Sequence, residues 1–459
     1  MPTFTPEQLA QMVQGPMLVV ILLVAIAFII LATARLKIHA FLALLITAYG
    51  VALAAKMPVL EIAKVIAAGF GGTLTAIGLV IIAGTIIGTF LERSGAALKM
   101  AETVLRVVGE KRPALAMSII GYIVSIPVFC DSGFVILSSL NKALSKKTKV
   151  SMATMAIALS TGLYATHTLV PPTPGPIAAA GNLNIANLGL VILVGLIVAI
   201  PATIAGYLWA VKYAGKFKVE PETSVSYDEL VKQHGKLPGA WRSFAPILVP
   251  ILLIALSSIA NFPSNPFGAG AVKTILSFLG TPVTALLIGV ALALFLVPKV
   301  TEEVLSGWVG AALKDAAVIL IITGAGGALG AVLKATPMGA YIGETLKNYQ
   351  VGILLPFIIA AALKTAQGSS TVSLVTTSAI VAPLLPALGL DGELARVLVV
   401  MAIGAGAMTV SHANDSYFWV VSQFSNIDVS TAYKTQTTAT LVQGLVTIAT
   451  VALLVAVLV

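Results

Sequence analysis

The sequence predicts an all-α polytopic membrane protein with two inverted repeats, re-entrant hairpins and broken helices. Three observations lead to this prediction: apolar stretches recur along the chain, two of them carry polar residues in the middle, and several landmarks of the first half return in the second. Of the 459 residues, 58% are hydrophobic and only 10% are charged, whereas a soluble domain carries about a quarter charged residues. This composition excludes a soluble enzyme and favours one transmembrane domain over residues 1–459.

A helix needs about 20 largely apolar residues to cross a bilayer. Two regions are apolar but interrupted, 113–141 and 350–390, and we expect each to form a hairpin that returns to its own side. Uninterrupted stretches of suitable length are 17–34, 38–55, 74–91, 150–168, 187–211, 244–260, 272–297, 317–335, 396–410 and 437–459.

The lysines and arginines predict the orientation, because cytoplasmic loops of membrane proteins are enriched in them. With the N-terminus outside, nineteen of the 27 basic residues fall inside and seven fall outside, the latter including Lys334, Arg396 and Lys434. Lys364 stays within the membrane. The first fifteen residues carry no basic segment before the first apolar stretch, so we expect no cleavable signal peptide.

One hydrophilic stretch divides the chain. Residues 213–242 hold most of the polar sequence between spans and predict a cytoplasmic linker between a first half, 1–212, and a second half, 243–459. Segments 92–112 and 299–316 mix charged and apolar residues at helical spacing, which predicts helices that lie in the membrane interface.

Three landmarks recur in the same order and predict an internal repeat. GTIIGTFLERSG from Gly84 resembles GGALGAVLKATPMG from Gly326, the polar break CDSGF at 130–134 corresponds to QGSST at 367–371, and Thr166-His167 corresponds to Ser411-His412. Small-residue patterns also arise by chance in membrane helices. Because the first hairpin is predicted inside and the second outside, the two units are expected to be inverted.

The two polar breaks are the expected substrate site. Irregular backbone at membrane depth is tolerated where it lines a cavity, and paired broken helices indicate the binding site of a transporter. Helix N-termini at such breaks attract anions, and hydroxyl side chains suit a polyol or a carboxylate. The candidates for substrate binding here are Asp131, Ser132, Gly133, Lys364, Gln367, Ser369, Ser370 and Thr371.

Two charged residues at these breaks admit more than one interpretation. Asp131 is costly inside a membrane, so we expect it to carry a coupling proton or to bind substrate hydroxyls. The alternative is a cap on the returning helix, a role that is compatible with either function. Lys364 is the matching cation of the second half. It could meet a substrate carboxylate, pair with an acid of the protein, or extend to the interface.

Two further breaks follow apolar helices. Four prolines within 171–176 cannot continue a helix, so this stretch is expected to be unwound and followed by a half-helix that ends before Asn182. The other break is 411–417. Together they add Thr173, Gly175, His412 and Asn414 as candidates for substrate binding, and His167 and Asp415 as candidates, with Asp131, for proton coupling. Histidines in membranes are also often packing residues.

Enzyme and cofactor motifs are missing from the sequence. Neither GxxxxGK[ST] nor HExxH occurs, and the single cysteine, Cys130, excludes a cysteine-based zinc site. The pairing of Ser132 with His167 as nucleophile and base is speculative. We therefore expect no catalytic residues, no metal, no cofactor and no nucleic-acid partner, and membrane lipid as the surroundings.

Three segments carry a resemblance to a known family. IPVFCDSGFVIL from Ile126, LVPPTPGPIAAAGN from Leu169 and SHANDSYFWVVSQF from Ser411 resemble signature stretches of the gluconate permease family, bacterial proton symporters for gluconate and related sugar acids. The resemblance covers nearly the whole chain. It implies the ion-transporter superfamily, with an elevator-type arrangement, a homodimer and a place in the bacterial inner membrane. Thr173 stands where family members often have histidine, which bears on which substrate is carried, since other members carry D-serine and hydroxy acids.

The sequence thus predicts a secondary active transporter that takes up gluconate or a related small hydroxy-carboxylate together with protons. A sodium-coupled carboxylate symporter remains an alternative, because hairpin carbonyls and hydroxyls also form sodium sites. A passive organic-anion channel is a second alternative from a different class.

Overall fold

The computed structural model describes residues 4–109, 111–221, 237–261, 267–268, 270–338, 341, 352–413 and 415–459, and within them every regular element is helical. The all-α prediction is confirmed for this part of the chain. The helices of the first half are α1 (Pro6–Gln11), α2 (Met17–Ile30), α3 (Ala40–Ala54), α4 (Val59–Arg93), α5 (Ala96–Val108), α6 (Pro113–Val124), α7 (Cys130–Thr148), α8 (Met152–Leu169), α9 (Pro174–Asn182) and α10 (Leu188–Lys212).

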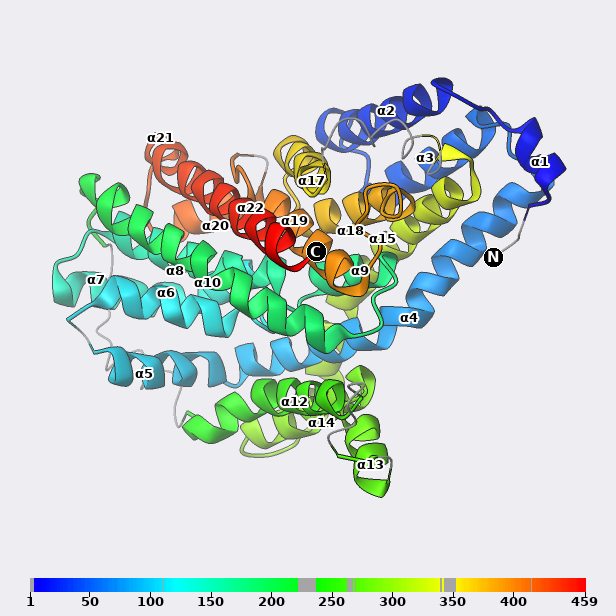
Figure 1. Ribbon diagram of the computed structural model, residues 1–459. Helices are drawn as coiled ribbons and strands as arrows, with labels where there is room; N and C mark the ends of the chain where they lie inside the picture. The colour runs from blue at the N-terminus through cyan, green and yellow to red at the C-terminus, as the bar shows by residue number, and fades with distance from the viewer. Residues whose placement is uncertain are drawn as a thin grey trace.

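The chain after residue 237 also forms long and short helices. Its elements are α12 (Ala240–Ala260), α13 (Ala271–Leu279), α14 (Pro282–Ala293), α15 (Val309–Ala335), α17 (Leu354–Gln367), α18 (Ser370–Val381), α19 (Glu393–Met408), α20 (Ser416–Phe424), α21 (Val429–Ala432) and α22 (Thr438–Leu458). In Figure 1, α4 runs obliquely from the N-terminal corner, and α12, α13 and α14 lie together on one side.

Five helical stretches among the described residues are long and apolar enough to cross a membrane. They are Val59–Arg93, Leu188–Lys216, Ala240–Ser257, Glu303–Ala335 and Val429–Leu458. Several predicted spans are instead shorter apolar helices, such as α3, which is 15 residues long. These short helices are apolar, although α3 has only part of its surface buried.

The structure corrects three expectations about helix extent. The predicted span 74–91 is part of the 35-residue helix α4, and the predicted interfacial segment 299–316 belongs instead to one helical stretch, Glu303–Ala335. The predicted span 272–297 is divided into α13 and α14, which meet at 65°. Gly280 and Pro282 lie at this bend, where proline starts a helix well but cannot continue one.

All four predicted breaks are present, but their positions differ from the prediction. The first lies before Cys130, at 125–129, so the acidic segment expected in the unwound tip forms the first turn of α7. The second is Gly368–Ser369, where Gly368 ends α17 with φ +90°, a conformation that favours glycine. The third is 170–173, followed by α9 as predicted, and the fourth lies between the end of α19 at Met408 and the start of α20 at Ser416.

The core is formed by α8 and α19. Every residue of α8 is buried, as is every residue of α19 from Val397 onward. Gly404 lets the two helices approach, because a Cβ there would lie 2.5 Å from the carbonyl oxygen of Thr168. Both helices end at a break, so the polar segments that follow them are held by the most buried part of the molecule.

One basic residue was assigned to the wrong end. Lys434 was expected on the side opposite Lys212, but the indole Nε1 of Trp209 donates a 3.0 Å hydrogen bond to Thr438 Oγ1. This bond joins the end of α10 to the start of α22, so Lys434 lies at the same end of the molecule as Lys212. The change strengthens the predicted charge asymmetry.

Two glycines fit α4 against the first and third breaks. A Cβ on Gly88 would lie 2.7 Å from the carbonyl oxygen of Pro127, and one on Gly84 would lie 3.0 Å from that of Pro172. These glycines are one turn apart, so the same face of α4 supports both breaks. The landmark around Gly84 therefore has a packing role that its resemblance to the segment at Gly326 did not reveal.

We expect Gly88→Ala to destabilise the protein by about 1–3 kcal/mol, because the added methyl group must displace the backbone of Pro127. Gly71→Ala is the matched control, since nothing lies within 4 Å of a Cβ at Gly71 in the same helix. The measurement is the melting temperature of each purified variant in detergent. A Gly88→Ala protein as stable as the Gly71→Ala protein would contradict the close packing.

Candidate functional site

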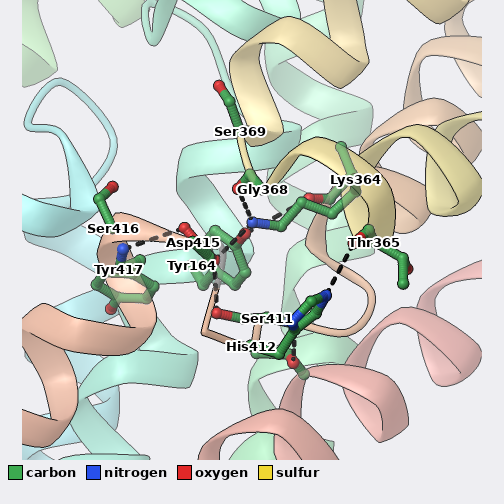
Figure 2. A network of polar contacts seen from close by, with 12 residues as sticks. Tyr164, Lys364, Thr365, Gly368, Ser369, Ser411, His412, Asp415, Ser416 and Tyr417 are labelled. Atoms are coloured by element: carbon green, nitrogen blue, oxygen red, sulfur yellow. Dashed lines mark hydrogen bonds and ion pairs between the residues drawn. The ribbon is translucent and has the colours of Figure 1, made fainter. Parts of the chain in front are cut away.

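A buried ion pair joins the second hairpin tip to the fourth break. Lys364, in the last turn of α17, has no exposed surface, and its Nζ lies 2.5 Å from Oδ2 of Asp415. The same ammonium group donates to the carbonyl oxygen of Gly368 and lies 5.7 Å from the ring centroid of Tyr164 (Figure 2). Of the three interpretations of Lys364, the structure has the internal pair, while the extended side chain is excluded.

Asp415 is also the N-cap of α20. Its Oδ1 accepts a 3.0 Å hydrogen bond from the backbone N–H of Tyr417, and its Oδ2 accepts from the Ser411 hydroxyl as well as from Lys364. Burying two charges costs several kcal/mol each unless their hydrogen-bonding capacity is filled. Here the Asp415 carboxylate accepts hydrogen bonds from three donors. These bonds offset the cost of burying the ion pair in a low-dielectric interior.

Asp131 lies close to this network. It occupies the first turn of α7, where its Oδ1 accepts a 3.2 Å hydrogen bond from the Ser416 hydroxyl. Its Oδ2 lies 3.6 Å from the Cys130 sulfur. Since Ser416 follows Asp415 in the chain, the two aspartates that were predicted independently belong to one polar region. No side chain caps the N-terminus of α7.

Histidine 412 contacts the hairpin tip. His412 Nε2 lies 2.8 Å from the carbonyl oxygen of Thr365, the residue after Lys364. As a carbonyl oxygen only accepts, this ring nitrogen carries the proton. Two consecutive residues of α17 are thereby fixed to the fourth break, which holds the tip and the break together (Figure 2).

The other predicted histidine lies deeper. His167 is 5% exposed, and among the described residues its Nδ1 has no hydrogen-bond partner. Its ring stacks on Tyr164 at 6.3 Å between centroids and lies 6.0 Å from that of Phe129. Tyr164 thus contacts His167 on one side and Lys364 on the other, which connects the first break to the ion pair.

Thr173 and Gly175 belong to a different contact. The Thr173 hydroxyl donates a 2.6 Å hydrogen bond to the carbonyl oxygen of Val170, and it does not cap α9. A Cβ on Gly175 would lie 2.5 Å from Leu374, so α9 begins against α18. These two residues shape the third break, and within the described part of the chain no hydrogen bond or ion pair joins them to Lys364 or Asp415.

The serines and threonine of the second tip start α18. Ser369 is the N-cap, accepting a 3.2 Å hydrogen bond from the N–H of Val372, while Ser370 is buried in the first turn and Thr371 is half-buried. Ser132 and Gly133 occupy the corresponding first turn of α7. The side chain of Gln367 and the whole of Asn414 lie outside the described residues.

Several members of the network were not selected from the sequence. Ser411, Ser416 and Tyr417 lie within the predicted fourth break, but only the structure shows that they donate hydrogen bonds to the carboxylates of Asp415 and Asp131. Tyr164 was missed altogether. Its position three residues before His167 places both on one helix face, which is the only signal the sequence contained.

The arrangement suits reversible binding of anions and protons better than the making or breaking of covalent bonds. It offers a lysine that can pair with a carboxylate, two carboxylates that can bind protons or hydroxyls, and the first turns of α7, α18 and α20. Within the described part of the chain, no group of three or more His, Cys, Asp or Glu side chains is placed to hold a metal ion.

Comparisons with known proteins give the family and the fold. Residues 17–458 match the model of the GntP family permease. The chain is 35% identical over 430 residues to a gluconate permease of Pseudomonas aeruginosa, covering 90% of this chain and 92% of the relative. It is 33% identical over 434 residues to the D-serine transporter DsdX of Escherichia coli, covering 93% and 96%. The YdaH transporter of Alcanivorax borkumensis has a similar structure, with a TM-score of 0.63 at 13% identity, over 88% of this chain and 90% of that one.

Proposed function

This chain belongs to the GntP family of permeases, and we propose that it is a secondary active transporter that takes up gluconate or a related small hydroxy-carboxylate together with protons. The family and its relatives are permeases and transporters, not enzymes, and the chain is a bacterial membrane protein. The observation that carries the proposal is the buried pair of Lys364 and Asp415 between a hairpin tip and a helix break.

Substrate binding is proposed as an exchange of carboxylates at Lys364. In the structure the ammonium group pairs with Asp415 at 2.5 Å. A substrate carboxylate that reaches Lys364 replaces Asp415, and the lysine keeps an anionic partner. The first turns of α7 and α18 then offer N–H groups and hydroxyls to the remaining substrate oxygens.

Proton coupling follows from charge balance. When the substrate displaces Asp415, that carboxylate loses its cation while still buried, and a buried unpaired carboxylate favours the protonated form. Each substrate anion therefore brings one proton to Asp415, and the loaded site has the same net charge as the empty one. Asp131 is proposed to accept hydrogen bonds from substrate hydroxyls. His167, next to Tyr164, is proposed to pass the proton.

The chemistry of the relatives supports a small hydroxy acid as substrate. One relative is named a gluconate permease and another a D-serine transporter, and both of those compounds join a carboxylate to at least one hydroxyl group. Gluconate is our first choice because it carries several hydroxyl groups. Ser132, Ser370 and Thr371 provide hydroxyl side chains in the first turns of α7 and α18 that can form hydrogen bonds with them. Thr173 shapes the third break and could bear on the choice between them.

We further propose inverted repeats and an elevator-type dimer in the inner membrane, with the N-terminus outside and a cytoplasmic linker at 213–242 between halves 1–212 and 243–459. The helix boundaries support the repeat: α9 begins at Pro174 and α20 at Ser416, the same separation as between Gly84 and Gly326. Each follows a long buried helix and a break.

The test of the function is uptake of labelled gluconate into proteoliposomes with an inward proton gradient and no sodium. We expect accumulation above the outside concentration, and its collapse when a protonophore is added. Uptake that requires sodium would favour the sodium symporter. Entry that never exceeds the outside concentration, whatever the gradient, would favour the channel and contradict active transport.

Asp131→Asn should lower gluconate uptake by about 10-fold or more while the protein inserts normally. The amide keeps the shape but weakens acceptance from substrate hydroxyls, and hydrogen bonds to charged groups contribute about 1.5–3 kcal/mol. Asp428→Asn is the matched control, since Asp428 is an exposed cap that accepts a hydrogen bond from Thr431. Uptake by Asp131→Asn equal to that of the control would remove Asp131 from the site.

A further inference from the structure

A second polar cavity lies away from the ion pair. Its volume is about 500 Å³, and it is enclosed by the middle of α4 and by the ends of α9, α15 and α18 with the start of α19. Ala379 of α18 lines it, nine residues from Ser370, which corresponds to roughly 14 Å along the helix. The cavity is therefore separate from the Lys364 site, although α18 connects the two.

Its charged lining is positive. Lys334 and Arg396 both line the cavity, and neither forms an ion pair in the part of the chain that the structure describes. Arg396 donates through Nη1 to the carbonyl oxygen of Leu183 at 3.3 Å, which fixes the guanidinium group. Among the described residues that line the cavity there is no aspartate or glutamate. A cavity lined by charge of one sign concentrates ions of the other sign.

Unfilled hydrogen-bonding atoms occur beside these charges. Arg396 Nε is buried and has no acceptor among the described residues. Asn182 uses its amide nitrogen to donate to Ser378 Oγ at 3.0 Å, while its Oδ1 is buried and has no donor there. Arg396 Nε can donate to a carboxylate, and Asn182 Oδ1 can accept from a hydroxyl group. The two atoms together match a ligand that carries both groups.

Hydroxyl side chains are frequent in the part of α18 between the cavity and the ion pair. Ser378, Thr377, Thr376 and Ser373 follow one another along α18, all without exposed surface. Thr376 and Thr377 have hydroxyls with no partner within the described ranges. Buried polar atoms are nearly always paired, so two unpaired hydroxyls in the helix that joins the cavity to the Lys364 site are unusual.

We infer that this cavity is an anion-binding vestibule that captures a small hydroxy-carboxylate before it reaches Lys364. The inference rests on the proposed function for the direction of transport. The charge distribution of the chain places Lys334 and Arg396 on the predicted outer side, where a substrate for uptake arrives. Arg396 and Lys334 attract the carboxylate, and Asn182 Oδ1 accepts from a hydroxyl group.

The electrostatic part can be measured without transport. Ala76 is exposed and lines the cavity, so Ala76→Cys in a Cys130→Ser background gives one reactive thiol. We expect an anionic methanethiosulfonate reagent to label it faster than a cationic one at low salt. The ratio of rates should fall by about 10-fold in Arg396→Gln/Lys334→Gln, and gluconate should slow labelling only where both cations are present. An unchanged ratio would overturn the inference.

Transport kinetics provide the second arm. Arg396→Gln should raise the KM for gluconate by about 5- to 10-fold with little change in kcat, and the effect should shrink as ionic strength rises. Arg396→Lys keeps the charge and should stay near the wild-type KM, as should Lys56→Gln, which removes an exposed lysine outside the cavity. A fall in kcat at constant KM would instead mean a structural role. If the wild type transports no carboxylate, the proposed function fails, while the labelling ratio still decides the vestibule.

Discussion

Asp415→Asn is expected to abolish net accumulation of substrate, by about 100-fold or more, while exchange of substrate across the membrane continues. Asparagine resembles the protonated aspartic acid, so the loaded site still forms around Lys364 and can change sides. The empty site cannot, because Lys364 is left buried without an anion. Removing one partner of a buried pair costs about 3–5 kcal/mol, and each 1.4 kcal/mol is a factor of ten.

The two activities are separated by loading the vesicles. Wild-type protein should show both uptake driven by a proton gradient and exchange of external labelled gluconate for internal unlabelled gluconate, whereas Asp415→Asn should show only exchange. Asp428→Asn again serves as the control. Proton-driven accumulation by Asp415→Asn at the wild-type level would exclude Asp415 as the proton carrier and direct attention to Asp131.

Lys364→Gln should abolish both uptake and exchange, by about 100-fold or more in each. The substrate carboxylate loses the only cation that the described structure places at the hairpin tip, and Asp415 remains beside an uncharged amide. Because a buried carboxylate can bind a proton, the protein can still fold. Exchange that survives in Lys364→Gln would mean that the substrate does not bind at this lysine.

The double variant Lys364→Gln/Asp415→Asn separates loss of function from loss of folding. It replaces two buried charges by two amides that can bond to each other, so its melting temperature should exceed that of Asp415→Asn alone. Replacing a buried ion pair by a neutral pair is often tolerated. It should nevertheless transport nothing, since neither the cation nor the proton acceptor is present.

The sequence was informative about the elements and less so about their boundaries. The prolines of 171–176 and Gly368 act through their own backbone preferences, so the third and second breaks were found close to their positions. The first break was placed too late, because Asp131 and Ser132 are polar and yet helical. They start α7, where acidic residues are favoured by the helix dipole.

The polar network itself could not be derived from the sequence. Lys364 and Asp415 are 51 residues apart, and only the packing of α17 against α19 brings them together. The sequence indicated that each is costly in a membrane and therefore has a partner or a task. It could not indicate that each is the other's partner, nor that Tyr164 lies beside both Lys364 and His167.

The central claim is that one proton accompanies each substrate anion because Asp415 gives up Lys364. The most direct test adds gluconate to the outside of proteoliposomes that hold a pH-sensitive dye, with equal pH on both sides and no sodium. The wild-type protein should acidify the interior as gluconate enters, and Asp415→Asn should not. Gluconate entry into wild-type vesicles with no change of internal pH would contradict the account.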